Sequence, residues 1–226
     1  MDDYIISFYN EKKEKKDFTI DKYFNCGSYG YVYKIDDDKC LKLFSEEFYF
    51  QPDVLKIIRD LKLNNFYEIY DILYDEDKMF IGYTMKYYEE DDIDITTMPI
   101  EYTLDNLYHL KESIKKLTSR HVAMLDCNSD NVIMDERNII MIDADMYYID
   151  EELNRKELLS DNYWALMGLF QSLYYDRVKS LGYSSTDNEY LLKTLFDEED
   201  ILNTEKRLIK YRYPIDYIKD FYKGRC

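Results

Sequence analysis

The sequence predicts a mixed α+β protein with two lobes, a small β-rich lobe over residues 1–87 and a reduced helical lobe over residues 88–226. Up to Tyr87 the apolar residues alternate in short runs that are typical of strands. An acidic connector at residues 89–94 follows, and beyond it apolar residues recur at the spacing of amphipathic helices. A chain of 226 residues is long enough to bury a core in two lobes that share a cleft.

One helix interrupts the strands of the first lobe. It is expected to begin at Pro52, because proline suits the first turn of a helix. Its apolar face would comprise Val54, Leu55, Ile58 and Leu61. The strands of this lobe are expected at residues 23–24, 31–35, 40–44 and 79–85.

The second lobe is expected to be mainly helical, with one hairpin. Its first helix would place Leu107, Leu110, Ile114 and Leu117 on one face. Further helical patterns occur at residues 163–173, 190–195 and 201–211. Between them, two short apolar runs at 132–134 and 139–142 flank a polar turn, which predicts a β-hairpin.

Composition excludes several classes of function. The net charge of −17, from 47 acidic and 30 basic residues, argues against binding to nucleic acid or to anionic membranes. The four cysteines have no C-x-x-C spacing, so neither a zinc site nor a disulfide framework is expected. No signal pattern or long apolar run is present, which predicts a protein of the reducing cytoplasm. The abundance of Lys, Asn, Ile and Tyr is typical of an AT-rich coding sequence, which suggests a bacterial or phage source.

Three oxygen-bearing side chains are expected to converge at one end of the hairpin. Asn131 precedes its first strand and Asp143 follows its second, and such positions lie about 5 Å apart in an antiparallel pair. Asp126 lies in the preceding loop and can reach the same place. Two carboxylates and an amide oxygen suit Mg²⁺, although these residues also suit the turns of an ordinary hairpin.

A second candidate site lies in the first lobe. Gly27, Ser28 and Gly30 lie between two strands, where small residues let backbone amides approach phosphate groups. Lys42 alternates with two leucines and is expected to point to the opposite face of its strand. The alternatives are an ordinary glycine turn and a lysine that faces solvent.

In this order the segments resemble the protein-kinase superfamily. Gly27, Gly30 and Val32 match the later part of G-x-G-x-x-G-x-V, and Lys42 matches the lysine of the third strand. Asp126 and Asn131 match the Asp-x4-Asn of the catalytic loop, and Asp143 matches the aspartate of D-F-G. Residues 161–169 are similar to the D-x-W-[SA]-L-G helix that buttresses this loop, a segment that would otherwise be an amphipathic helix with Asp161 as N-cap.

The resemblance implies an ATP- and Mg²⁺-dependent kinase of a compact, atypical kind. Asp126 would orient the acceptor hydroxyl as a base, Lys42 would bind the α- and β-phosphates, and Asn131 and Asp143 would hold Mg²⁺. The connector between the lobes would contact adenine through its backbone. The complete nucleotide-binding set would be Gly27, Ser28, Gly30, Val32, Lys42, Met85, Tyr87, Asn131 and Asp143.

Several positions depart from the kinase pattern. Asn25 replaces the first glycine of the loop. Met124 and Leu125 replace the His-Arg pair, and because the arginine that would pair with a phosphorylated activation loop is missing, control by activation-loop phosphorylation is not expected. Asn128 stands where Ser/Thr kinases usually have a lysine. Asp143-Ala144-Asp145 replaces D-F-G, the segment that follows is short, and A-P-E is missing. The carboxylate that would pair with Lys42 is left open among Glu46, Glu47, Asp53 and Asp60, with Asp53 or Glu47 favoured.

The sequence therefore leaves three functions open. The first is a kinase that acts on protein serine or threonine, or on a small hydroxylated molecule as in aminoglycoside- and choline-kinase-like enzymes. The second is a nucleotide-binding pseudokinase that signals by its shape. The third is an acidic interaction protein with accidental motif matches. The oligomeric state is also left open.

Overall fold

A computed structural model describes residues 4–20, 22–27, 29–45, 51–89, 91, 93–182, 184–197 and 201–223. The chain is a mixed α+β protein, as the sequence predicts, and it forms two compact units, Met1–Glu89 and Glu90–Cys226. The boundary expected from the sequence lies between residues 87 and 88. Ser28, Glu46 and Glu47 lie outside the described residues.

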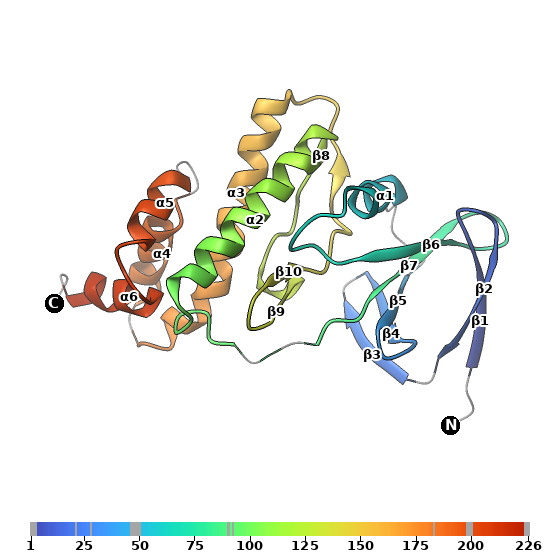
Figure 1. The fold of residues 1–226 in the computed structure, drawn as a ribbon, viewed down its shortest axis with the longest axis horizontal. Coiled ribbons are helices and arrows are strands. Elements are labelled where there is room, and N and C mark those ends of the chain that lie inside the picture. Colours follow the sequence, from blue (N-terminus) through green and yellow to red (C-terminus); the bar gives the residue numbers. More distant parts are fainter. Residues whose placement is uncertain are drawn as a thin grey trace. The chain divides into compact units, whose positions relative to one another are not determined.

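The first unit contains a seven-stranded antiparallel sheet with the order β2-β1-β6-β7-β5-β4-β3 (Figure 1). The four strands expected from the sequence correspond to β3, β4, β5 and β7 and are confirmed, whereas β1, β2 and β6 were not predicted. The strands are β1 (Tyr4–Asn10), β2 (Lys15–Ile20), β3 (Lys22–Gly27), β4 (Gly30–Lys34), β5 (Lys39–Phe44), β6 (Ile69–Tyr74) and β7 (Phe80–Lys86).

Helix α1 (Pro52–Leu61) connects β5 to β6 and begins at Pro52, as expected. It ends where Lys62 adopts a left-handed conformation with φ of 46°. Val54, Leu55 and Ile58 are buried, whereas Leu61 is only half-buried. The residues of the unit that are completely inaccessible to solvent lie on the central strands of the sheet, and they include Leu41, Ile72, Leu73 and Tyr83.

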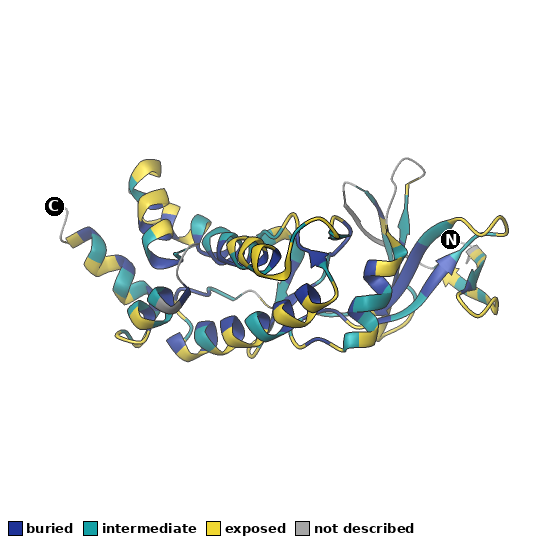
Figure 2. Ribbon diagram, turned by 90° about the horizontal axis from the view of Figure 1, so that it is seen from above, coloured by how far each residue is buried: buried dark blue, intermediate teal, exposed yellow. Residues whose placement is uncertain are grey.

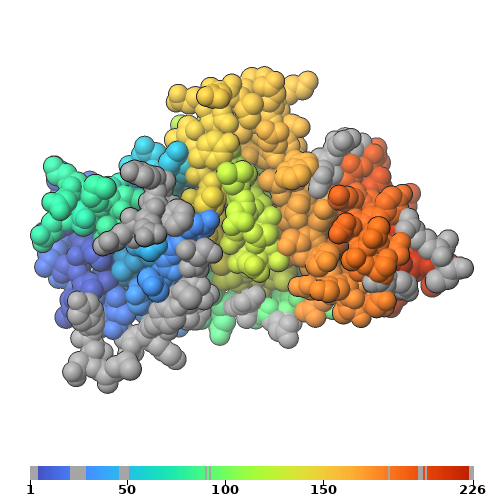
Figure 3. Space-filling model, turned by 180° about the vertical axis from the view of Figure 1, so that it is seen from behind, coloured from blue at the N-terminus to red at the C-terminus, as the bar shows by residue number. Residues whose placement is uncertain are grey.

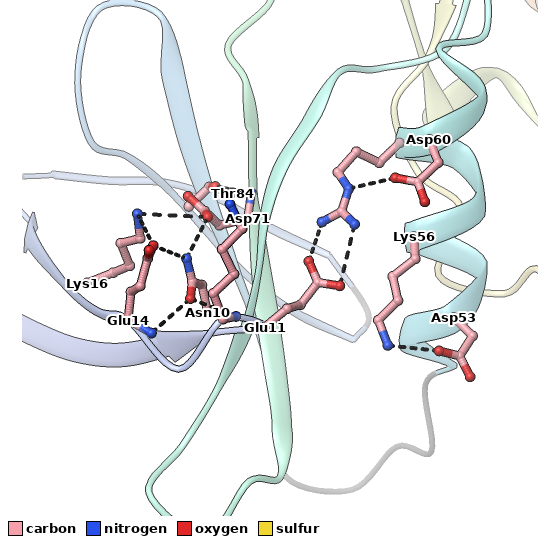
Figure 4. Close-up of polar contacts among 11 residues, drawn as sticks. Asn10, Glu11, Glu14, Lys16, Asp53, Lys56, Asp60, Asp71 and Thr84 are labelled. Carbon is pink, nitrogen blue, oxygen red and sulfur yellow. Dashed lines mark hydrogen bonds and ion pairs between the residues drawn. The ribbon is translucent and has the colours of Figure 1, made fainter.

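The β1–β2 hairpin is joined by polar contacts to β6 and to α1 (Figure 4). The buried amide of Asn10 donates to Glu14 at 2.9 Å and to Asp71 at 3.3 Å. Glu11, in the turn between the two strands, forms a bidentate pair with Arg59 of α1. These contacts fix one end of α1 to the edge of the sheet.

The second unit is mainly helical, with α2 and α3 side by side along most of their length (Figure 1). From behind, the light green surface of α2 adjoins the yellow and orange surface of α3 (Figure 3). A hydrogen bond of 2.7 Å between the buried hydroxyls of Thr103 and Tyr174 links the two helices. The helices are α2 (Ile100–Ser119), α3 (Arg155–Lys179), α4 (Ser185–Leu195), α5 (Ile201–Leu208) and α6 (Pro214–Lys223).

The helix boundaries confirm some expectations and correct others. Leu107, Leu110, Ile114 and Leu117 of α2 all have 0% exposure, which confirms the predicted apolar face. Figure 2 shows that the long helices carry both buried and exposed residues, as amphipathic helices do. Helices α4 and α5 were expected, and α6 was not. None of the described helices combines the length and apolar character needed to cross a membrane.

The start of α3 differs from the expectation. The helix begins eight positions before residue 163, and its N-cap is Asn154, which forms a capping box with Glu157. Asp161 therefore lies inside the helix, and its assignment as N-cap was wrong. The first turn was missed because its residues are charged, and charged residues give no apolar periodicity.

Two short antiparallel strand pairs complete the second unit. The predicted hairpin is confirmed as β9 (Val132–Met134) and β10 (Ile139–Met141), with Met141 opposite Val132. Strand β8 (Val122–Ala123) pairs with β11 (Tyr148–Ile149). The loop between β8 and β9 contains Asp126, so it is held between the two pairs.

Candidate functional site

The candidate site is centred on residues 124–131 of the second unit, which end in a 3-10 turn, η1 (Ser129–Asn131). Helix α3 supports this loop at two points. Asn162, only 1% exposed, accepts a hydrogen bond from the Met124 amide at 2.8 Å and donates to the Val122 carbonyl at 2.9 Å. Further along α3, the Ser172 hydroxyl accepts from the Ser129 amide at 3.1 Å. Asp126 is therefore held on both sides by side chains from one helix.

Asn162 is a positioning residue that the sequence analysis missed. The kinase resemblance placed the buttress in the segment that begins at Asp161, but Asp161 is exposed and its neighbour Asn162 makes the contacts. The spacing of the motif contained the signal. Its aspartate stands two positions before the tryptophan, and Asn162 stands two positions before Trp164.

Asp126 and Asn131 are directly hydrogen bonded. The Asn131 Nδ2 donates to the main-chain carbonyl of Asp126 at 2.7 Å and to its Oδ2 at 3.0 Å. A carbonyl oxygen can only accept, so the nitrogen of the Asn131 amide must be the atom that faces Asp126. No described residue donates to the Asn131 Oδ1, which is thus oriented by the loop and available as a ligand for a cation.

The backbone at Asp126 is in the left-handed region, with φ of 56°. Aspartate tolerates this conformation better than most residues, because its short side chain can hydrogen bond locally. Here Asn128 supplies such a contact, since its Nδ2 donates to the Asp126 Oδ1 at 2.7 Å. Both carboxylate oxygens of Asp126 therefore accept a hydrogen bond from an amide of its own loop.

Asp143 follows directly after the point where the hairpin strands meet the loop. The Ile142 amide donates to the Asn131 carbonyl at 3.0 Å, which confirms that Asn131 and Asp143 lie at the same end of the hairpin. The Asp143 Oδ1 accepts from the Asp145 amide at 2.9 Å and so closes a tight turn. The structure thus brings the predicted Asp126, Asn131 and Asp143 to one end of the hairpin.

The opposite end of the hairpin is anchored to α2. The Tyr102 hydroxyl donates to the carbonyls of Asp135 and Asn138 at 3.1 and 3.0 Å. The buried Asn106 accepts from the Ile139 amide at 2.7 Å. Burial raises the pKa of Tyr102, so its hydroxyl remains protonated and able to donate. These contacts make the hairpin a fixed support for the residues at its other end.

Cys127, next to Asp126, is a neutral thiol at physiological pH. Burial raises its pKa to about 11, even though a contact of 3.5 Å with the Tyr147 hydroxyl acts in the opposite direction. A thiolate nucleophile needs a lowered pKa, so this loop is not built for cysteine chemistry.

In the first unit, Lys42 of β5 is 5% exposed, so the solvent-facing alternative was wrong. It lies opposite Val32 on one neighbouring strand and Tyr83 on the other. Asp53, one of its favoured partners, instead pairs with Lys56 at 2.8 Å and has a side chain that is 68% exposed. Asp60 pairs with Arg59 at 3.2 Å. Neither of these helix carboxylates is the partner of Lys42.

Gly30, one of the two glycines of the predicted phosphate loop, has a packing role. Gly27 and Gly30 lie opposite each other where β3 meets β4. A Cβ atom at Gly30 would lie 2.2 Å from the Leu43 carbonyl oxygen, so no larger residue fits this sheet position. Gly30 is therefore required by strand packing whether or not its backbone also meets a phosphate. Val32, two positions after Gly30 in β4, is half-buried.

Two backbone amides at the end of β7 and in the connector after it already donate hydrogen bonds within the first unit. Met85 is buried in β7. The Lys86 amide donates to the Glu68 carbonyl at 2.9 Å, and the Tyr87 amide donates to the Asp38 carbonyl at 2.7 Å. The predicted contact of Tyr87 with adenine therefore cannot use its own amide. The next amide, at Tyr88, has no described backbone acceptor.

Two of the cavities that described residues line each lie within one unit. The larger, of about 600 Å³, is in the first unit beside the β1–β2 turn and contains none of the predicted site residues. Two of its charged residues are already paired, Glu11 with Arg59 and Lys56 with Asp53 (Figure 4). The smaller, of about 270 Å³, is in the second unit and borders Ser129 of the candidate loop. Convergent chemistry, rather than cavity size, therefore marks the loop as the candidate site.

The described residues contain no group of three or more His, Cys, Asp and Glu side chains that could enclose a metal. Asn131 and Asp143 would supply two oxygen ligands, a number that suits Mg²⁺, which retains water and phosphate ligands. No protein-family model matches the chain, and a search of curated proteins finds no significant match.

Proposed function

We propose that this chain is an ATP- and Mg²⁺-dependent phosphotransferase with a two-lobed protein-kinase-like fold. The acceptor would be a hydroxyl group, of a protein serine or threonine in the first instance or of a small molecule. The observation that carries the proposal is the hydrogen bond from Asn131 to the Asp126 carbonyl. It couples the proposed base to an amide oxygen that can bind a cation, at the same end of the hairpin as Asp143.

The topology of each unit supports the proposal independently. In the first unit, five neighbouring strands of the sheet have the order β3-β4-β5-β7-β6. The glycine turn joins β3 and β4 at one edge, Lys42 lies on β5, the middle one of these five, and α1 follows β5 along the chain. In the second unit the loop lies between two short antiparallel pairs and rests on α3. The same order of elements and motifs is typical of protein kinases.

Each residue would have a distinct role. Asp126 would orient the acceptor hydroxyl and accept its proton, while Lys42 would bind the α- and β-phosphates. Asn131 and Asp143 would hold Mg²⁺, which when bound neutralises charge on the phosphates. The Tyr88 amide and nearby backbone would contact adenine. The free thiols of Cys40 and Cys127 are compatible with the reducing cytoplasm that the sequence predicts.

One observation favours a second candidate, a nucleotide-binding pseudokinase. Asn128 stands where Ser/Thr kinases usually have a lysine, and it donates to the Asp126 Oδ1. Asn131 donates to the other carboxylate oxygen, Oδ2. Each oxygen of Asp126 therefore has one lone pair left to accept a hydrogen bond from an acceptor hydroxyl. Such a site could bind Mg-ATP without transferring its phosphate.

Incubation with γ-labelled ATP and Mg²⁺ separates the two candidates. The purified chain would be tested alone and with generic protein acceptors, beside Asp126→Asn, Asp143→Asn and a control, Asp130→Asn, which removes an exposed carboxylate from the same loop. Transfer that is lost in the first two variants and kept in the control supports the kinase. Mg-ATP binding without transfer supports the pseudokinase, and the absence of both contradicts the proposal.

A further inference from the structure

The cavity of about 270 Å³ in the second unit has no role in the chemistry described above. It lies between α3 and α4 and reaches the candidate loop at Ser129, whose hydroxyl accepts from Ser172 at 2.9 Å. Ligand pockets for whole small molecules usually exceed about 300 Å³. This cavity therefore fits one chemical group of a larger ligand.

Gly168 forms part of the cavity wall and is otherwise unexplained. It lies in the interior of α3, where glycine is less favourable than alanine. A Cβ atom at this position would meet no other atom within 4 Å, so close packing does not require glycine. Its backbone is helical, so conformation does not require it either. The absence of a side chain does, however, keep the cavity open.

The charges around the cavity are suited to a cation. Asp176 of α3 and Glu189 of α4 contribute exposed carboxylates that have no ion-pair partner among the described side chains. Lys193 of α4 is the only basic residue in the cavity wall that the structure describes. Two carboxylates against one ammonium leave a negative site, and the hydroxyls of Ser129 and Ser172 add hydrogen-bonding oxygens.

The cavity lies close to the proposed base along the chain. Ser129 is three positions after Asp126, so the backbones of the two residues are at most about 11 Å apart. A group bound beside Ser129 would therefore lie within about three residues' length of a hydroxyl at Asp126.

We propose that this cavity binds an ammonium or guanidinium group of the acceptor and thereby selects acceptors in which a positive charge lies near the phosphorylated hydroxyl. The inference rests on the proposed phosphotransferase function and adds its acceptor class. The positive group could belong to a lysine or arginine within about three residues of a serine in a peptide, or to an amino group on a small polyol. Both sources present the same chemistry to Asp176 and Glu189.

Binding is best measured without nucleotide, so that the result does not depend on catalysis. The probes are a serine peptide with two arginines, the same peptide with citrulline in place of arginine, glucosamine, and glucose. Titrations would be followed by the backbone amide resonances of the full chain. We expect the resonances of Ser129, Gly168 and Glu189 to shift with the arginine peptide or with glucosamine, and not with the uncharged analogues. The positive probe that binds identifies the source of the cation.

Three variants test the site. Asp176→Asn and Glu189→Gln should each weaken binding about threefold to tenfold. Glu152→Gln removes an exposed carboxylate elsewhere in the unit and should have no effect. Gly168→Ala should raise the melting temperature by about 1–4 °C and still weaken binding, because it favours the helix but narrows the cavity. A gain in stability shows that any loss of binding is not caused by misfolding.

The outcomes separate this inference from the kinase proposal. Charge-selective binding supports the cavity assignment even if no phosphate is transferred. Equal shifts with charged and uncharged probes, or no shifts with any of them, overturn it. Phosphate transfer that is equal for the arginine and citrulline peptides, and unchanged in Glu189→Gln, overturns it while leaving the kinase proposal intact.

Discussion

Asn131 donates from one side-chain nitrogen to both the main-chain carbonyl and the carboxylate of Asp126, at 2.7 and 3.0 Å. The two residues are five positions apart, and the 3-10 turn η1 folds one back onto the other. The contact fixes the nitrogen of the Asn131 amide against Asp126 and leaves its Oδ1 as the atom that can bind a cation. It therefore links the proposed base to the proposed cation ligand.

Loss of this link should affect both stability and activity. Asn131→Ala removes two hydrogen bonds and should lower the free energy of unfolding by about 1–2 kcal/mol, which urea titration can measure. Phosphate transfer should fall at least about 100-fold, because a group that positions transition-state charge is lost. Retention of transfer in Asn131→Ala would show that Asn131 has no part in the site.

Asn162 should be the buttress of the loop, in place of Asp161. Asn162→Ala leaves the Met124 amide and the Val122 carbonyl without their buried partner and should lower the free energy of unfolding by about 2–4 kcal/mol. Asp161→Ala, at the exposed neighbouring position, should change it by less than about 0.5 kcal/mol. Urea unfolding of the two variants decides the matter, and equal effects would refute the assignment.

Lys42 should bind nucleotide rather than maintain the fold. Lys42→Met keeps an apolar stem of similar length in β5, so a cooperative unfolding transition should remain. Affinity for Mg-ATP should fall about 10- to 100-fold, measured by calorimetry, since charged hydrogen bonds to phosphate are lost. Lys39→Met is the matched control on the same strand, because Lys39 is 47% exposed and pairs with Asp36. Equal affinities for the two variants would remove Lys42 from the site.

The Cys127 thiol should react slowly in the folded chain. Burial raises its pKa from 9.0 to about 11, so at pH 8 the thiolate fraction is about 100-fold lower than in the unfolded chain. Folding favours the neutral form of the thiol, so the raised pKa stabilises the folded chain at pH values where the thiol is protonated. The resulting stability is complete below about pH 9 and is lost as the pH rises towards 11.

Alkylation by iodoacetamide, followed by mass spectrometry of the Cys127 peptide, measures this directly. The rate should increase about tenfold for each pH unit between 7 and 9, and about 100-fold at pH 8 when the chain is unfolded in urea. Fast labelling of the folded chain at neutral pH would contradict the half-buried, neutral thiol.

The sequence predicted the elements whose periodicity is set by local packing. The leucines of α2 follow from burial on one face of the helix, whereas β5 and β10 bury consecutive residues and so give short continuous apolar runs. Strand β2 was missed because lysines and an aspartate occupy much of this edge strand and hide its alternation. The start of α3 was missed because capping, rather than apolar spacing, marks it.

The residues of the site were harder to assign than its position. Motif spacing located Asp126, Asn131 and Asp143, because hairpin geometry brings the ends of paired strands together. It could not choose between Asp161 and Asn162, since only helix phase decides which of two adjacent side chains faces the loop. Motif spacing also did not predict that Asp53 pairs with Lys56 one helical turn away, because oppositely charged residues on the same helix compete for each partner.

Paramagnetic Mn²⁺, used in place of Mg²⁺ with ATP, gives the most direct test of the central claim. Relaxation by the bound ion broadens the resonances of nuclei that lie near it. In amide spectra of the full chain, the proposed site predicts that Mn-ATP broadens the side-chain amide of Asn131 and the backbone amides of Asp143 and Ala144, whereas the amide of Glu152 remains sharp. If Mn-ATP broadens residues elsewhere and leaves Asn131 and Asp143 unaffected, these residues do not hold the metal and the phosphotransferase assignment fails.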